Sequence, residues 1–170
     1  MDDDRLSGKT KNCVDVLGNE WNYECMGCAI RDKEIVPPGG IIYDGKYCIL
    51  ASDPEVPIPG FLVINSKKHI KSFSELGEAE RHEIVDVLYK AENALKKLNV
   101  SNEFTVVQEE RSSHLHVWIF PNYDWMATEF GKGISYLRDI SAYAKENSND
   151  DNVKNVLMVV EEVRKILNEL

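Results

Sequence analysis

One stretch of sequence decides the fold: Ser113-His114-Leu115-His116-Val117-Trp118-Ile119-Phe120-Pro121. It is rich in aromatic and β-branched residues and ends in a proline, which is typical of a β-strand. Strand side chains alternate between two faces. One face carries the polar and aromatic side chains, which are His114, His116, Trp118 and Phe120. The other face is aliphatic and is predicted to be core: Leu115, Val117 and Ile119.

The two histidines of this strand indicate function more than packing. On one strand face their imidazoles lie about 7 Å apart. If His114 and His116 were simply core residues, each ring nitrogen would need a hydrogen-bond partner. A strand that served only packing would carry valine or isoleucine at these positions. The sequence therefore favours a functional pair over a pair of satisfied core histidines.

Composition narrows the classes of partner. The 170 residues are 43% hydrophobic and 29% charged, which indicates a globular chain. The net charge of −9 argues against a nucleic-acid partner, which clustered lysine and arginine would hold, but leaves room for a small phosphorylated ligand. No apolar run has the length of a membrane span, and the acidic start lacks the apolar stretch of a signal peptide. We therefore expect a cytoplasmic protein whose cysteines are reduced or metal-bound.

The rest of the chain predicts an α+β fold with an antiparallel sheet, because strands precede and follow a long helix. Residues 1–20 show no strong periodicity and are predicted to be a loose arm. Residues 65–70 are predicted to be a polar loop. Further strands are expected at 41–43, 47–50, 61–64 and 104–107, and helices at 78–98, 134–144 and 153–170.

Cys25 and Cys28 have the spacing of a zinc-binding pair, which supplies half of a tetrahedral site. The sequence contains no second pair of this kind, so the missing ligands should be histidines. The available histidines are His69, His82, His114 and His116. Two other readings of the cysteine pair remain open, a redox dithiol and a pair of idle thiols.

From about Cys25 to Pro121 the chain resembles the histidine triad (HIT) superfamily of nucleotidyl hydrolases and transferases. The resemblance rests on an ordered set of motifs: the Cys25-x-x-Cys28 pair, the strand Phe61-Leu62-Val63-Ile64, its exit Lys67-Lys68-His69-Ile70, the long helix, and His114-x-His116-x-Trp118. It implies a HIT-like nucleotide-binding domain over residues 21–125. Residues 126–170 would be a C-terminal helical extension packing on that domain. Family members are commonly homodimers, so the same is expected here.

The resemblance also implies a mechanism. The middle histidine of the family motif attacks the α-phosphate of a nucleotide and forms a nucleotidyl-histidine intermediate, and His116 has that position. A neutral imidazole is nucleophilic near neutral pH, which suits this role. Trp118 replaces the third histidine of the family, and indole offers one N–H donor only. The alternative is therefore a weak or inactive zinc-stabilised module that binds a nucleotide.

Other site residues follow by the same resemblance. Zinc-bearing relatives combine the cysteine pair with two histidines, which correspond to His69 and His114. The glycine-rich turn usual before the histidine strand is replaced by Glu109-Glu110-Arg111-Ser112-Ser113, where Arg111 and Ser112 could bind phosphate. The two glutamates would repel phosphate unless they point outward. Trp118 would line the nucleotide site, and Asp53 would bind the ribose unless it is simply a turn residue before Pro54.

Overall fold

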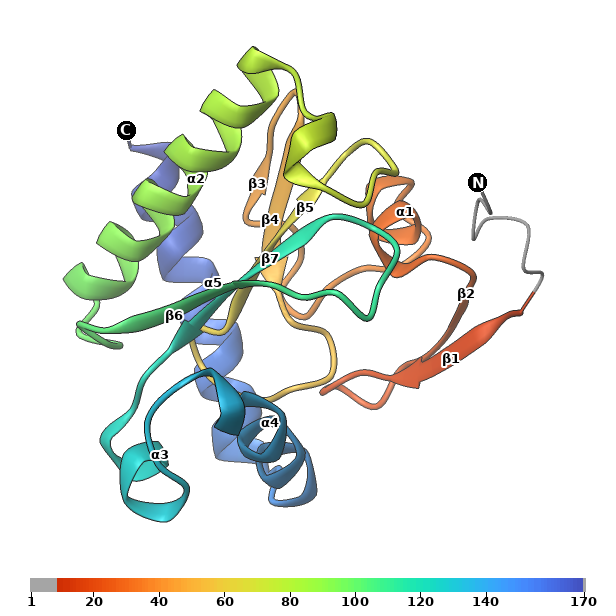
Figure 1. Ribbon diagram of the computed structural model, residues 1–170. Coiled ribbons are helices and arrows are strands. Elements are labelled where there is room, and N and C mark those ends of the chain that lie inside the picture. Colours follow the sequence, from red (N-terminus) through yellow and green to blue (C-terminus); the bar gives the residue numbers. More distant parts are fainter. Residues whose placement is uncertain (1–8, 170) are drawn as a thin grey trace.

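The computed structural model describes residues 9–169 and is built on a five-stranded antiparallel sheet in the order β3-β4-β5-β7-β6 (Figure 1). The strands are β3 Tyr43–Asp44, β4 Cys48–Ser52, β5 Leu62–Ser66, β6 Phe104–Gln108 and β7 His116–Pro121. The helices are α1 Met26–Arg31, η2 Phe73–Glu75, α2 Glu78–Lys97, α3 Asp124–Glu129, η3 Ile134–Tyr136, α4 Leu137–Glu146 and α5 Asp150–Asn168. The predicted α+β class is confirmed.

The histidine strand β7 lies inside the sheet, between β5 and β6. Its register pairs Trp118 with Val63 of β5 and with Val107 of β6, and it pairs His116 with Asn65. Strands β6 and β7, which a short connection joins, pair antiparallel. An interior strand exposes no free edge, so the position of its side chains is fixed from both sides.

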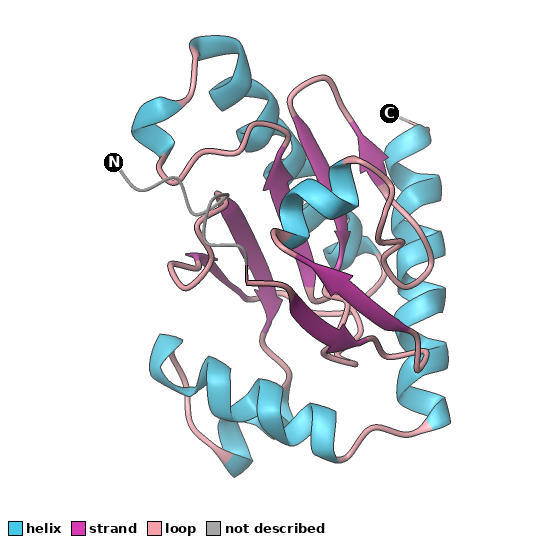
Figure 2. Ribbon diagram, turned by 90° about the vertical axis from the view of Figure 1, so that its right-hand side faces the viewer, coloured by secondary structure: helices cyan, strands magenta, loops and turns pink. Residues whose placement is uncertain are grey.

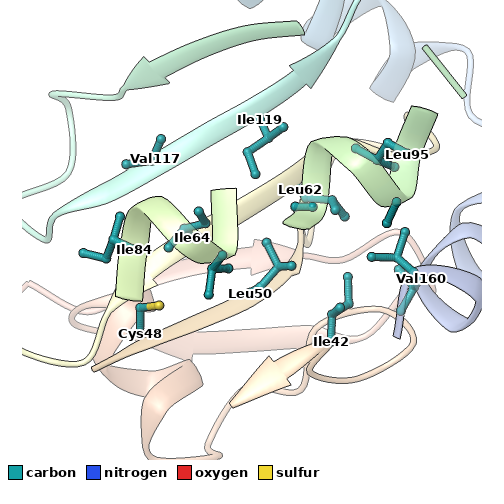
Figure 3. Close-up of a cluster of buried hydrophobic side chains, with 14 of the residues drawn as sticks. Ile42, Cys48, Leu50, Leu62, Ile64, Ile84, Leu95, Val117, Ile119 and Val160 are labelled. Atoms are coloured by element: carbon teal, nitrogen blue, oxygen red, sulfur yellow. The ribbon is translucent and has the colours of Figure 1, made fainter. Parts of the chain in front are cut away.

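The aliphatic face of the sheet forms the main core with α2 and α5. Val117 and Ile119 of β7 are 5% and 0% exposed, as predicted for this face. Figure 3 shows Ile84 and Leu95 of α2 among the side chains of the strands, with Val160 of α5 on the same side as Leu95. Figure 2 shows α5 running beside the strands to the C-terminal end. None of the helices within residues 9–169 combines the length and apolar character that a membrane crossing requires.

The opposite face of β7 is only partly open. Phe120 is fully buried, and Trp118 packs against Phe61 with ring centroids 5.2 Å apart. Met126 of α3 and Ile140 of α4 cover this end of the face. The helices after Pro121 therefore cover the half of this face that carries Phe120. They leave the half that carries His116 open to a pocket.

The prediction of a loose arm over residues 1–20 is wrong for the part that the structure describes. Two strands, β1 Lys11–Val14 and β2 Glu20–Tyr23, form an antiparallel hairpin. Asp15 closes the hairpin by accepting hydrogen bonds from the backbone N–H groups of Leu17 and Asn19 and from the indole of Trp21. Strands of four residues give too short a pattern to be recognised from sequence. Residues 1–8 of the predicted arm lie outside the described residues.

The other predicted elements are present with ends shifted by at most three residues. The strand expected at 41–43 is reduced to β3 Tyr43–Asp44, and the short helices α1 and α3 were not predicted. Helix α2 ends before Asn99, whose φ of 54° is the left-handed conformation that commonly ends a helix. Asn149 caps α5 by accepting a hydrogen bond from the backbone N–H of Asn152. The polar loop predicted for 65–70 is wrong at its start, because Asn65 and Ser66 belong to β5 and are buried. The domain boundaries at residues 21, 125 and 126 stay predictions.

Candidate metal centre and active site

The four residues predicted to bind a metal come from three separate segments and meet at one point. Cys25 caps the N-terminus of α1 and Cys28 lies in its first turn. His69 lies in the loop after β5, and His114 lies two residues before His116, the first residue of β7. Their ligand atoms all lie within 4.8 Å of one another. This is a Cys2His2 cluster of the composition found in structural zinc sites.

The spacing of the cluster fits a tetrahedral ion. The Nδ1 atoms of His69 and His114 are 3.3 Å apart. The four sulfur–nitrogen distances range from 3.2 to 3.6 Å. A tetrahedral zinc with ordinary bond lengths requires about 3.3 Å between nitrogens and about 3.6 Å between sulfur and nitrogen. The side chains are therefore arranged around a space of the right size for this metal.

The surroundings of His114 prepare its Nδ1 for coordination. Its Nε2–H donates to the carbonyl oxygen of Ser66 at 2.6 Å, which leaves the Nδ1 lone pair toward the cysteines. Burial lowers the pKa of His114 to about 4, so the ring is neutral at pH 7. Burial also raises the pKa of the Cys28 thiol to about 11, which disfavours a redox dithiol and means that a thiolate here would need a bound cation. The orientation and neutral form of His114 are what favour a metal site.

Gly27 lets helix α1 pack directly on the imidazole of His114. A Cβ atom at Gly27 would lie 2.6 Å from Cδ2 and 2.7 Å from Cγ of that ring. His114 is 1% exposed and held by Ser66, so the ring has little freedom to move aside. One of the two residues between the cysteines is thus restricted by its contact with a predicted ligand.

We therefore expect Gly27→Ala to move His114 and to weaken metal binding by about tenfold or more, the scale of effects from displaced supporting groups. Competition with a chromophoric chelator measures the affinity. Gly77→Ala is the control, since the φ of −70° at Gly77 is open to alanine and the added Cβ would lie 3.4 Å from Oε2 of Glu80, an ordinary contact. Equal metal affinity in the Gly27→Ala and wild-type proteins would show that the ring adapts.

His116 is separate from this cluster and faces a pocket. Its Nδ1–H donates to the backbone carbonyl oxygen of His114 at 2.8 Å, so a neutral ring has its lone pair on Nε2. The side chain is 12% exposed. The pocket has a volume of about 470 Å³ and is lined by both strand histidines and Trp118, by Asn65 of β5, by the 109–113 turn and by residues 52–55.

Glu109 points into the pocket. Its side chain is 8% exposed, and Oε2 lies 3.4 Å from Nε2 of His116. Oε1 accepts hydrogen bonds from Nε of Arg111 at 3.1 Å and from Nη2 of Arg138 at 3.0 Å. Burial by itself would raise the pKa of Glu109, but these hydrogen bonds outweigh burial and lower it. An ionised carboxylate therefore faces His116.

The comparisons with known proteins agree on one fold. No protein-family model matches the chain. An uncharacterised HIT-like protein of Methanocaldococcus jannaschii is 27% identical over 115 residues, covering 64% of this chain and 88% of that protein. The structure of a Hit-like protein involved in cell-cycle regulation from Bartonella henselae, with an unknown ligand, superposes with a TM-score of 0.58 at 17% identity, covering 81% and 92% of the two chains.

A zinc-bound histidine triad family protein from Mycobacterium smegmatis superposes with a TM-score of 0.56 at 12% identity, covering 83% of this chain and 96% of that one. The chain has the histidine triad fold. The HIT resemblance read from the order of the motifs is thereby confirmed. The His-x-His-x-Trp form of the motif is a property of this sequence.

The fold brings all four predicted nucleotide-site residues to the pocket. Arg111, Ser112, Trp118 and Asp53 all line it. Ser112 is already engaged, because its Oγ accepts a hydrogen bond from the backbone N–H of His114. Asp53 closes a turn by accepting the N–H groups of Glu55 and Val56 with Oδ1. Its contact with a ribose stays a prediction.

Three polar residues of the HIT site were missed or misplaced from sequence. Glu109 points inward, whereas an outward direction was needed for phosphate to bind. Arg138 of α4 reaches Glu109 from a helix that follows the motif region. Asn65, 7% exposed beside His116, was taken for the start of a loop. A polar residue directly after the apolar run Phe61-Leu62-Val63-Ile64 was the available signal for Asn65.

Proposed function

We propose that the chain is a nucleotidyl hydrolase or transferase that acts at a nucleotide α-phosphate through a nucleotidyl-His116 intermediate. The observation that supports this most strongly is the hydrogen bond from Nδ1 of His116 to the carbonyl oxygen of His114. It directs the Nε2 lone pair into a pocket of about 470 Å³, which is within the size range of small-ligand sites. The uncharacterised HIT-like relative and the HIT fold support the same class of activity.

The reaction would proceed in two displacements. In the first, Nε2 of His116 forms a bond to the α-phosphorus, and the bond to the leaving group breaks with its electron pair. In the second, water or another acceptor forms a P–O bond, the P–N bond breaks, and its electron pair returns to Nε2. The acceptor's proton passes to solvent.

Different pocket residues would bind different parts of the nucleotide. Arg111 would bind the phosphate oxygens through its positive charge. Ser112 would hold the turn that carries Arg111 in place beside the pocket. Trp118 gives an apolar wall against which a nucleoside can lie. Asp53 would contact the ribose hydroxyls. Candidate donors are nucleoside phosphoramidates, dinucleoside polyphosphates and similar α-phosphate esters.

We further propose that Cys25, Cys28, His69 and His114 hold a structural zinc ion. The ion would neutralise the thiolates and hold α1 against the start of β7. All four positions are taken by protein ligands, so no open coordination site is left for substrate. The ion would keep the carbonyl of His114 in the position that orients His116.

A second candidate is a zinc-stabilised nucleotide-binding module without turnover. Trp118 cannot give a proton on demand, and the Glu109 carboxylate lies 3.4 Å from the proposed nucleophile. Calorimetry separates the two candidates. Tight nucleotide binding without turnover, unchanged by His116→Asn, would favour the binding module. Cytoplasmic location and homodimeric assembly stay predictions.

The test of the proposed function is turnover by the metal-loaded protein. Incubation with a panel of dinucleoside polyphosphates and nucleoside phosphoramidates should release nucleoside monophosphate, which chromatography detects. Activity should persist in excess chelator as long as the structural metal stays bound. Absence of any nucleotide product across the panel, with a folded and metal-loaded protein, would contradict an enzymatic role.

A further inference from the structure

The Glu109 carboxylate is surrounded as a bound anion would be. Oε1 accepts hydrogen bonds from the backbone N–H of Arg111 at 3.1 Å, from its Nε at 3.1 Å and from Nη2 of Arg138 at 3.0 Å. Oε2 faces Nε2 of His116 at 3.4 Å. Arginine and backbone N–H groups are the donors that proteins use for phosphate as well as for carboxylate. The site for an anion beside His116 is thus filled by the protein itself.

We infer that Glu109 stands in for a ligand phosphate in this state, and that Arg138, with Arg111, binds that phosphate once Glu109 has moved away. The inference rests on the proposed function and deepens it, since it names the second phosphate-binding cation of the same site. It also gives the C-terminal helical region a role, because Arg138 belongs to α4.

The exposure of the three side chains supports an exchange of anions. Glu109 is 8% exposed, whereas Arg111 and Arg138 are 68% and 42% exposed. The carboxylate is the buried member, and both guanidinium groups reach it from the solvent side. A ligand phosphate could keep contact with both arginines while Glu109 turns out to water. The ligand would then face the guanidinium groups of Arg111 and Arg138 and no longer the carboxylate of Glu109.

The neighbouring acid gives a matched control. Glu110 also contacts Nη2 of Arg138, at 3.3 Å, but its side chain is 78% exposed. Glu110 does not line the pocket that His116 faces. Removing its charge changes the net charge as much as removing that of Glu109. If the Glu109 carboxylate occupies the anion site, only the substitution of Glu109 should change the affinity for phosphate.

A purely structural role for the same contacts predicts something different. If Glu109 only ties α4 to the 109–113 turn, Glu109→Gln should lower the melting temperature and leave anion binding unchanged. If it fills the phosphate site, the same substitution should strengthen anion binding. The two accounts differ in the sign of a measurable affinity change.

The test is calorimetric titration of the metal-loaded protein with inorganic phosphate and, separately, with AMP. We expect Glu109→Gln to bind both about tenfold or more tightly than wild type, because a repelling buried carboxylate is lost and two arginines are released. Glu110→Gln should change affinity less than about twofold. Arg138→Gln should weaken AMP binding about tenfold, and should remove most of the gain when combined with Glu109→Gln. Lys154→Gln, on the exposed side of α5, is the control for loss of one positive charge.

Unchanged phosphate affinity in a folded Glu109→Gln protein would overturn the inference, as would wild-type AMP affinity in Arg138→Gln. Arg138 is half exposed, so its variant keeps the inference testable even if Glu109→Gln fails to fold. A different result would contradict the proposed function without contradicting the anion site. If phosphate binding gains through Arg138 but AMP binds no better than phosphate in any variant, the anion site stands and the nucleotide assignment falls.

Discussion

His116→Asn is expected to abolish nucleotidyl transfer while leaving the fold and the metal centre intact. Asparagine can still donate a hydrogen bond to the carbonyl oxygen of His114, but its amide nitrogen has no nucleophilic lone pair. Loss of a covalent nucleophile typically lowers kcat by about 10⁴-fold or more. The measurement is the turnover rate at saturating donor, together with metal content and melting temperature.

His82→Asn is the matched control for this prediction. His82 lies on the exposed side of α2, outside the pocket and the metal cluster. It should turn over at the wild-type rate. A His116→Asn protein that retains a tenth or more of the wild-type rate would show that another group attacks the phosphate.

Cys28→Ser is expected to lose the metal and to destabilise the protein strongly. Without the ion, no bond would connect the cysteines of α1 to His69 and His114, and the buried Nδ1 atom of His114 would lose its metal partner. An ion present at about 1,000 times its dissociation constant stabilises the folded state by about 4 kcal/mol. At about 2–4 °C per kcal/mol for a domain of this size, the melting temperature should fall by about 10 °C.

Metal analysis of the purified protein and thermal melts with and without chelator check this prediction. Cys13→Ser is the matched control, because Cys13 is equally a free thiol but is buried in the β1–β2 hairpin, outside the metal cluster. It should retain the metal and its response to chelator. A Cys28→Ser protein with wild-type metal content, or one whose loss of metal leaves the melting temperature unchanged, would contradict a structural metal.

The histidine strand shows how much of the fold the sequence could predict. Alternation over residues 113–121 separates the core side chains from the site side chains, and the structure buries Val117 and Ile119 as expected. The long helix and the cap at Asn149 were also predictable, because periodicity and capping chemistry are local. The convergence of Cys25, Cys28, His69 and His114 depends on pairing distant segments, and only the family resemblance could suggest it.

The parts that could not be predicted depend on tertiary contacts. The β1–β2 hairpin has short strands and is held by Asp15, whose role appears only when the turn is formed. The Glu109 carboxylate is held by Arg111 of the same turn and also by Arg138, 29 residues later in the chain. No short sequence pattern could show that the 109–113 turn, which precedes β7, contacts α4, which follows it. These are the contacts that decide how the pocket is filled.

Trapping the covalent intermediate tests the central claim most directly. The metal-loaded protein is mixed with a nucleotide donor, quenched without acid to preserve the P–N bond, and examined by intact-mass and peptide mass spectrometry. We expect a nucleotidyl adduct on the peptide that contains His116, absent from His116→Asn and present in His82→Asn. An adduct on another residue, or none with any donor while free nucleotide product accumulates, would contradict it.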